Sequence, residues 1–205
     1  TYEYEAVIPG LLKRWYAERQ EMQQKMRDCG DNEIEREYWD KRQLVKKINL
    51  NSLYGAILNP GCRFFDMRIG QSVTLTGRCI TQHMGAKVNE VITGEYNHVG
   101  KSVIYGDTDS VYFSAYETLK KEIEAGKIEW NEDSVIALYD KIAQETNGSF
   151  KSYMTRAFHC PSTRGEVIAA GRELVGTKGL FITKKRYALL YYDKEGTRTD
   201  QAGEP

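Results

Sequence analysis

The stretch SVIYGDTDSVYFS, Ser102–Ser114, sets two acidic residues between two runs of strand-forming side chains. Asp107 and Asp109 lie one residue apart, with a glycine before them and a serine after them. Valine, isoleucine, tyrosine and phenylalanine favour strands, whereas glycine, aspartate and serine favour tight turns. The segment therefore predicts a β-hairpin whose turn is acidic.

The acidic turn has two interpretations. If the backbone stays roughly extended through Thr108, Asp107 and Asp109 point to the same face and their carboxylates converge. Convergent carboxylates suit Mg²⁺, which binds oxygen ligands and keeps several waters or substrate phosphates, although a third acid normally completes such a site. The alternative is a plain hairpin, because Gly-Asp and Asp-Ser are good turn residues by themselves.

Residues 1–60 predict an antiparallel helical hairpin. Residues 7–27 carry a partial apolar stripe, with Pro9 in the first turn of the helix. Asn32 followed by Glu35 resembles a capping box that opens a second helix, which continues to about Leu58. The charge of this pair is too high for burial on all sides, so we expect it to project from the main body. A solvated pair whose charges only face water is the alternative.

The rest of the chain predicts helices and strands in separate stretches. Residues 63–70 indicate a short strand or a connection, and residues 71–96 indicate a long helix whose small side chains favour close packing on a sheet. Residues 116–157 are helical in character with a break at Asn147–Gly148, and residues 165–196 indicate strands with turns at the glycines. Helices segregated from antiparallel strands predict an α+β fold.

Composition limits the class of protein. The 205 residues carry a formal charge of zero, so a nucleic-acid partner would have to meet a local basic face. The four cysteines are widely spaced and include no C-x-x-C, which argues against a disulfide framework and a cysteine zinc site. His159 adjoins Cys160, but two neighbouring ligands are not a site. No apolar run of about 18 residues predicts a membrane span, so we expect a cytoplasmic protein.

Two further segments carry side chains of functional character. In KKINLNSLYG, residues Lys47, Asn51 and Tyr54 fall on one face of the predicted helix. A face with a cation, an amide and an aromatic ring suits a nucleotide. The alternative is that Lys47 is an ordinary exposed lysine and that Tyr54 packs at the base of the hairpin. Arg19 could join Lys47 if the hairpin is antiparallel. In TKKRYALLYYD, the three adjacent cations Lys184–Arg186 suit a polyanion, or else they protect an exposed strand edge.

These segments together resemble the family B DNA polymerases, in particular the replicative enzymes of T-even-type phages. KINLNSLYGA matches the K-x-x-x-N-S-x-Y-G motif of the family's fingers helix, and YGDTDS matches its catalytic palm hairpin. KKRY matches the palm motif that holds the primer–template duplex, and SVTLTGR is similar to the helix that follows the fingers. The likeness covers about residues 7–195, and the order and spacing of the motifs make it specific.

The resemblance implies a fold and a set of metal ligands. It implies a fingers hairpin over residues 1–60 and part of an antiparallel palm sheet with packed helices over residues 61–205. Asp109 would bridge two Mg²⁺ ions, Asp107 would lie beside the metal site, and Glu166 would be an extra palm acid near the pair. Two such ions would clamp the attacking and leaving oxygens when a primer 3′-hydroxyl attacks an incoming nucleotide.

The resemblance also implies nucleotide-binding and DNA-binding residues. Lys47 and Arg19 would contact the triphosphate, Asn51 would lie nearby, and Tyr54 would pack at the nascent base pair. The primer–template backbone would follow the palm motif Lys184, Lys185, Arg186 and Tyr187. The implied partners are primer–template DNA, a dNTP, the remaining polymerase parts (the first-aspartate segment, exonuclease and thumb) and a sliding clamp, in the host cytoplasm if the protein is phage-encoded.

The sequence departs from the family pattern at two points. The family has a lysine one turn after the fingers arginine, where this chain has Gln23, with Lys25 two residues later. The motif D-x-x-S-L-Y-P-S, which supplies the other essential aspartate, does not occur in the sequence. We therefore expect a fragment or one piece of a split polymerase, nearly or wholly inactive alone. The alternative is a non-catalytic module that binds duplex DNA or another subunit.

Overall fold

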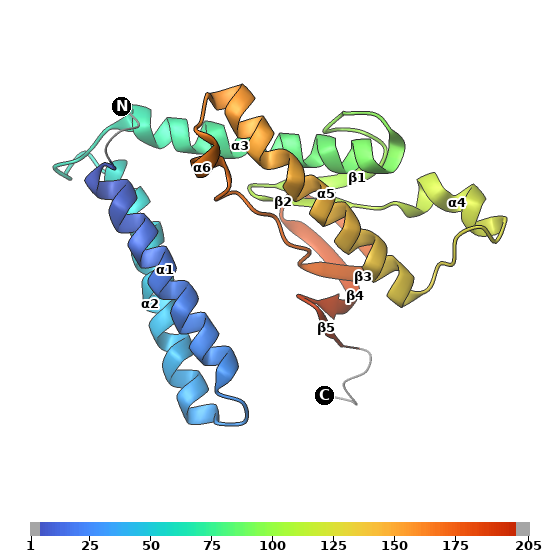
Figure 1. Cartoon of the computed structure of the whole chain (residues 1–205), viewed down its shortest axis with the longest axis horizontal. Helices are drawn as coiled ribbons and strands as arrows, with labels where there is room; N and C mark the ends of the chain where they lie inside the picture. The colour runs from blue at the N-terminus through green and yellow to red at the C-terminus, as the bar shows by residue number, and fades with distance from the viewer. Residues whose placement is uncertain (1–4, 200–205) are drawn as a thin grey trace. The chain divides into compact units, whose positions relative to one another are not determined.

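The computed structural model describes residues 5–199, which form two compact units that meet between Thr74 and Leu75. Helices and antiparallel strands occur in separate parts of the chain, which confirms the predicted α+β class (Figure 1). The boundary between the units falls inside helix α3 (Met67–Thr93), after residue 60. The assignment of residues 1–60 to fingers and 61–205 to palm stays a prediction.

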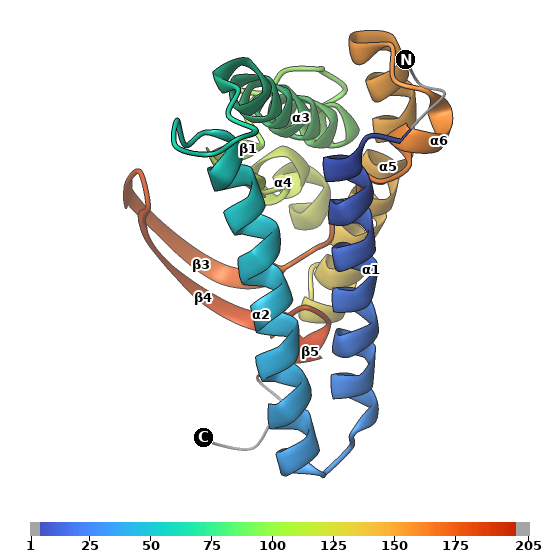
Figure 2. The same cartoon turned by 90° about the vertical axis from the view of Figure 1, so that its left-hand side faces the viewer.

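The first unit is built on the predicted pair of helices, α1 (Val7–Asp28) and α2 (Glu33–Ile57), which run antiparallel side by side (Figure 2). Asn32 caps α2 as expected, because its Oδ1 accepts the Glu35 N–H at 3.2 Å. The Asn32 amide also donates to the Glu35 carboxylate at 3.3 Å. The first of these contacts satisfies one backbone donor that the first turn of a helix leaves open, and the second joins the two side chains.

Pairs of partly exposed side chains fix the register of α1 against α2. The Lys46 ammonium lies 2.5 Å from the Glu18 carboxylate and 5.7 Å from the centre of the Trp15 ring. Nearer the tip, the Lys25 ammonium lies 4.7 Å from the centre of the Trp39 ring. Cations over aromatic faces add attraction while keeping their charge in contact with water. Some of the charged residues of these two helices therefore hold α1 and α2 together.

Helix α3 begins earlier than predicted. Residues 67–70, expected as a strand or connection, form its first turn. The reason is Asp66, whose carboxylate accepts the Arg68 backbone N–H at 2.9 Å and pairs with the Arg68 guanidinium at 2.8 Å. Those hydrogen bonds lower the pKa of Asp66 to about 2. An aspartate in this position caps a helix, so the chain turns helical at once.

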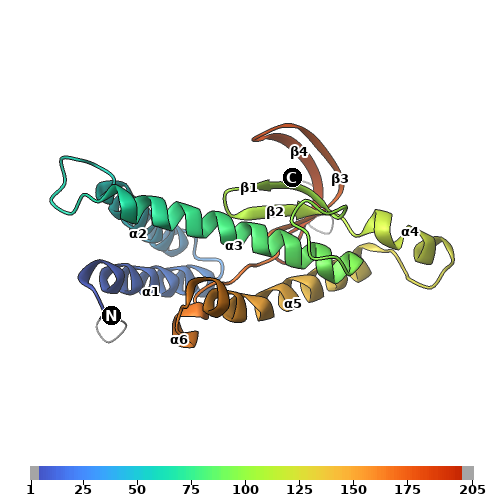
Figure 3. The ribbon, with the colours of Figure 1, turned by 90° about the horizontal axis from the view of Figure 1, so that it is seen from above.

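The second unit holds the predicted acidic hairpin. Strands β1 (Val103–Asp107) and β2 (Ser110–Phe113) are antiparallel, and Asp107 pairs with Ser110 across a two-residue turn. Three helices follow along the chain, namely α4 (Tyr116–Glu124), α5 (Glu132–Phe158) and the short α6 (Ser162–Gly165). The part of α3 in this unit lies beside α5 and along the acidic hairpin (Figure 3).

The predicted break at Asn147–Gly148 is wrong, because α5 runs unbroken through both residues. The Asn147 side chain is used in tertiary structure instead of in a turn. Its amide donates to the Ala170 carbonyl at 2.6 Å and its oxygen accepts the Ala170 N–H at 2.7 Å. An asparagine that pairs a distant backbone in this way satisfies its polar atoms without leaving the helix.

One of the two turns between the C-terminal strands lies at a predicted glycine, and the other does not. Strands β3 (Leu174–Thr183) and β4 (Arg186–Lys194) reverse at Lys184–Lys185, and β5 (Thr197–Arg198) pairs with β4 after a turn that contains Gly196. Gly176 lies inside β3, where a Cβ would come within 2.5 Å of the Leu190 carbonyl oxygen. This glycine permits a close approach of strands at a register shift and does not mark a turn.

The second unit contains a small apolar core with a buried ion pair beside it. Val135, Val175 and Tyr192 are buried together where α5 meets β3 and β4. Next to them, the Arg172 guanidinium pairs with the buried carboxylate of Asp193 and with another aspartate. The ion pair compensates a charge that burial would otherwise make costly. All four cysteines are free.

Within residues 5–199, no helix is both long and apolar enough to cross a membrane.

Candidate active site

The chain turns more tightly at Thr108 than an extended backbone from Asp107 to Asp109 would. Thr108 has a φ of +51°, so the chain reverses here and does not run extended from Asp107 to Asp109. Pairing Asp107 with Ser110 leaves only two residues for the reversal, and such turns need a positive φ. Asp107 is half-buried and Asp109 is exposed. Their convergence on one metal ion stays a prediction.

The Asp107 carboxylate has a distant cationic partner. The Lys185 ammonium lies 2.5 Å from the Asp107 Oδ2, and the Thr108 hydroxyl donates to Oδ1 at 3.2 Å. The hydrogen bond from Lys185 lowers the pKa of Asp107, and the same contact raises the pKa of Lys185. The Lys185 backbone N–H also donates to the Tyr105 hydroxyl at 2.9 Å. These contacts bring the basic turn and the acidic hairpin together.

Four aromatic rings also join the β1–β2 hairpin to the β3–β4 hairpin. Tyr105 and Tyr112 are cross-strand partners on β1 and β2, and Phe181 and Tyr187 are partners on β3 and β4. Their ring centres lie 5.1–5.9 Å apart, and the hydroxyls of Tyr112 and Tyr187 are 2.8 Å apart. Burial, followed by the Tyr187 hydrogen bond, raises the pKa of Tyr112.

Of these four rings, sequence reasoning singled out only Tyr187, as a DNA-binding residue. In the structure the Tyr187 hydroxyl bonds Tyr112 and its ring packs within the cluster. The signal for the other three was the cross-strand pairing itself, since aromatic residues opposite one another in a hairpin pack on the same face.

The three basic residues of the predicted DNA-binding motif are exposed. Lys184 and Lys185 form the turn, and Arg186 begins β4 opposite Thr183. Lys185 has a φ of +63°, which the tight reversal between two long strands requires. Two of the three cations therefore form the hairpin tip, and Arg186 is the first residue of the strand that follows.

Glu166, the extra acid predicted for the metal site, forms an ion pair with a lysine of α5. Glu166 follows α6 and is exposed, and its carboxylate is paired with the Lys151 ammonium of α5. In the part of the chain that the structure describes, no group of three or more His, Cys, Asp or Glu side chains lies close enough to hold a metal ion.

The predicted nucleotide-binding residues lie in the first unit, on the two long helices. Lys47 and Asn51 are exposed on α2, while the half-buried Tyr54 donates its hydroxyl to the Gly70 carbonyl at 3.0 Å. On α1, the Arg19 Nε donates to the Gln43 Oε1 at 3.1 Å, one helical turn before Lys47. Lys47 and Asn51 thus face solvent, and Tyr54 is held at the end of the hairpin.

Gln23 occupies the position where the resemblance led us to expect a lysine. Gln23 is half-buried, and the nearby Lys25 is paired with Glu21 at 2.8 Å and lies over the Trp39 ring. Lys25 is therefore engaged within the hairpin.

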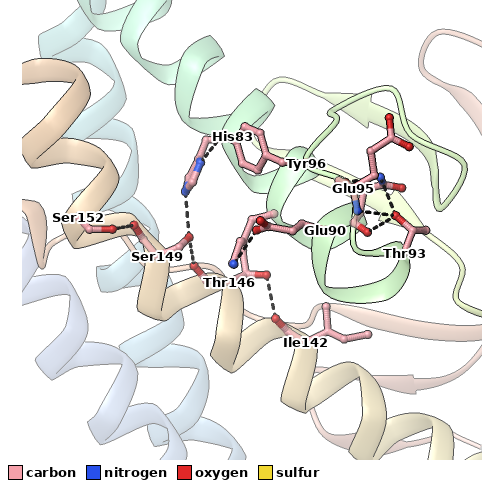
Figure 4. Close-up of polar contacts among 11 residues, drawn as sticks. His83, Glu90, Thr93, Glu95, Tyr96, Ile142, Thr146, Ser149 and Ser152 are labelled. Atoms are coloured by element: carbon pink, nitrogen blue, oxygen red, sulfur yellow. Dashed lines mark hydrogen bonds and ion pairs between the residues drawn. The ribbon is translucent and has the colours of Figure 1, made fainter.

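The structure contains a second polar feature that sequence reasoning missed, a cavity of about 610 Å³ between α3 and α5. The wall includes His83, which is 6% exposed and stacked on Tyr153 with ring centres 3.9 Å apart. The His83 nitrogens lie 2.7 Å from the Tyr96 hydroxyl and 2.9 Å from the Ser149 hydroxyl (Figure 4). No motif identified His83, because its partners lie up to 66 residues away.

The hydrogen-bond directions in this network define the state of His83. The Ser149 hydroxyl donates to the Thr146 carbonyl at 2.6 Å, so it accepts from the His83 Nε2–H (Figure 4). In a neutral ring, Nδ1 then accepts from the Tyr96 hydroxyl. Burial lowers the pKa of His83, and the neighbouring charges of Lys87 and Arg156 lower it further.

The donor set of the acidic turn can be compared with the needs of a hard cation. Asp109 presents an exposed carboxylate, and Asp107 presents one that already attracts the Lys185 ammonium. Carboxylate oxygens suit Mg²⁺, which takes one or two of them and completes its shell with water and phosphate oxygens. The two aspartates fit such an ion as partial ligands.

Comparison with known proteins gives a consistent picture. Residues 2–157 match the model of DNA polymerase family B. The chain is 34% identical over 168 residues to a DNA-directed DNA polymerase of Escherichia phage RB69, and 30% identical over 167 residues to that of Enterobacteria phage T4. Each match covers 76% of this chain and 18% of the relative.

The likeness extends to an archaeal protein. A DNA polymerase of Pyrococcus glycovorans is 29% identical over 194 residues, which cover 95% of this chain and 20% of the relative. The chain thus spans no more than a fifth of the length of these three relatives.

Proposed function

The chain belongs to DNA polymerase family B, and on that premise we propose that it contributes to DNA-templated nucleotidyl transfer in a larger polymerase. In this proposal Asp109 and Asp107 are part of the catalytic site and hold Mg²⁺ together with ligands from outside the chain. Two Mg²⁺ ions, when bound, would stabilise charge on the attacking and leaving oxygens. Glu166 is proposed as a further acid of the same site.

The observation that carries the proposal is the contact between the acidic and basic hairpins. Lys185 lies 2.5 Å from Asp107, so a cationic tip stands directly beside the carboxylate of Asp107. A primer strand held at such a tip brings its phosphates to Lys184, Lys185 and Arg186, next to the acids. Contacts of this kind orient a duplex without reading its sequence.

The first unit would supply the nucleotide contacts. The half-buried cation Arg19 and the exposed cation Lys47 suit the triphosphate, and Asn51 lies one turn from Lys47 on α2. Tyr54, held through its hydroxyl to Gly70, would pack against the new base pair. We propose residues 1–60 as fingers and 61–205 as palm. The partners would be primer–template DNA, a dNTP, the remaining polymerase segments and a sliding clamp, in a cytoplasmic setting.

The decisive experiment uses the complete polypeptide that the gene encodes. We expect metal-dependent primer extension that Asp109→Ala abolishes. Glu129→Ala, at an exposed acid outside the site, serves as the matched control and should leave extension unchanged. Extension at the wild-type rate by the Asp109→Ala protein would contradict the proposal.

A second candidate is a non-catalytic module that binds duplex DNA or another subunit. The exposed cations at the β3–β4 tip favour it, since they could bind phosphate without any metal. Salt-dependent DNA binding combined with a complete polypeptide that extends no primer would support this alternative.

A further inference from the structure

Thr81 of α3 contacts the acidic turn directly. Its hydroxyl donates to the Thr108 carbonyl at 2.7 Å, across 27 residues of sequence. The same hydroxyl lies 3.1 Å from the Gly77 carbonyl one turn earlier in α3. Threonines within helices commonly bond the carbonyl four residues back, and that contact alone would have no functional meaning. Here the shorter contact is the one to the turn.

The carbonyl that Thr81 holds belongs to the most constrained residue of the turn. Thr108 is β-branched, yet its φ is +51°, a region that such residues rarely adopt. Residues kept in sparsely populated backbone conformations need surrounding structure to hold them, and they cluster at functional sites. The Thr108 carbonyl shares its peptide plane with the Asp109 N–H. A hydrogen bond to that carbonyl therefore fixes the plane from which Asp109 extends.

Helix α3 is well placed to serve as a fixed support. One turn after Thr81, a Cβ at Gly85 would lie 3.6 Å from the His98 carbonyl and 3.8 Å from the Val111 side chain. The helix thus approaches the acidic hairpin closely. From its other side, the Tyr153 hydroxyl of α5 donates to the Cys79 carbonyl at 3.2 Å. The hydroxyl of Thr81 projects from a helix that is held on both sides.

We propose that Thr81 is a positioning residue, which sets the Thr108–Asp109 peptide so that the Asp109 carboxylate is presented to a divalent cation. The inference rests on the proposed function of Asp109 as a metal ligand. Thr81 itself touches neither metal nor substrate. It acts on the geometry of the turn, as an outer hydrogen-bond partner acts on a metal ligand.

Two variants of nearly matched shape test the proposal. Thr81→Val keeps the branched side chain but removes the hydroxyl, whereas Thr81→Ser keeps the hydroxyl and removes the methyl group. Both are made in the 205-residue chain, and their folding is checked by thermal unfolding. NMR then follows the Thr108 carbonyl carbon, the hydrogen exchange of the Asp109 amide, and the broadening of turn resonances by added Mn²⁺.

We expect Thr81→Val to shift the Thr108 carbonyl resonance, to speed exchange at Asp109 and to raise the Mn²⁺ concentration for half-broadening about tenfold. Thr81→Ser should restore all three to near wild type. The proposal is overturned if Thr81→Val matches wild type, or if both variants change the turn equally, since the methyl group would then be responsible.

The two hypotheses fail in distinguishable ways. If Mn²⁺ broadens no turn resonance in the wild-type chain, the metal role proposed for Asp109 loses its support in this chain. The positioning role is then decided by the Thr108 carbonyl shift and by Asp109 exchange. An unchanged turn in Thr81→Val rejects it, and a changed turn that Thr81→Ser restores supports it.

Discussion

The Lys185 ammonium lies 2.5 Å from the Asp107 carboxylate, although 78 positions separate the two residues in the chain. The lysine side chain is 65% exposed and the aspartate side chain 17% exposed. The cation therefore remains open to solvent while it compensates the charge of a half-buried acid. The tip of one hairpin is thereby fixed beside the acidic turn of another.

The first prediction concerns DNA binding at the basic tip. Arg186→Ala and Lys184→Ala should each reduce the slope of log binding constant against log salt by about 0.9, because one phosphate contact is lost. Fluorescence anisotropy with a short duplex at several salt concentrations measures the slope. Lys120→Ala, which removes an exposed cation of α4, should leave the slope unchanged. A slope unaffected by either tip variant would count against phosphate contacts there.

The second prediction concerns the activity of the chain by itself. We expect no primer extension by the 205-residue polypeptide, because the motif D-x-x-S-L-Y-P-S, expected to supply the other essential aspartate, does not occur in the sequence. A labelled primer–template assay with Mg²⁺ and all four dNTPs measures extension. Metal-dependent extension by this chain, lost in Asp109→Ala, would refute the prediction.

The third prediction concerns pH. The folded-state pKa of His83 is lowered from its ordinary value of 6.5, chiefly by burial, so the folded chain binds fewer protons at this site than the unfolded chain. The contribution of His83 to the free energy of unfolding therefore falls as the pH drops below about 6.5. This fall ends once the pH is below the folded-state pKa. Urea unfolding between pH 5 and 8 measures the effect.

Two variants isolate the contribution of His83. In His83→Gln the part of the pH dependence that arises below about 6.5 should disappear, because glutamine does not titrate. In Arg156→Gln the histidine pKa, followed by NMR, should rise, since a neighbouring positive charge is removed. An Arg156→Gln protein whose His83 titrates as in wild type would show that this charge has no influence.

The fourth prediction compares two glycines. Gly176→Ala should destabilise the chain by about 1–3 kcal/mol, because the new Cβ meets the Leu190 carbonyl at 2.5 Å and the strands must shift. Gly148→Ala should stabilise it by about 0.5–1 kcal/mol, because Gly148 lies within α5 with open space around it. Chemical denaturation of both variants measures the difference, and equal effects would contradict the packing argument.

Local signals predicted the helices and the acidic hairpin well. The capping residue Asn32 and the helical pattern after it gave the start of α2, and the Asn32 hydrogen bond confirms the reason. The same approach misjudged Asn147, since an Asn-Gly pair usually marks a turn. The Asn147 amide is instead bonded to Ala170, a partner that lies 23 residues away and carries no local signal.

The sequence by itself determined the family, the first pair of helices, the acidic hairpin and the residue types that carry charge. Those properties depend on neighbours a few positions apart and on motifs such as YGDTDS. Only the tertiary structure decided that Lys185 pairs with Asp107, that Thr81 holds Thr108, and that His83 lies buried between Tyr96 and Ser149. Contacts of this kind join residues 13 to 78 positions apart. They arise from how packed elements meet, which local periodicity does not encode.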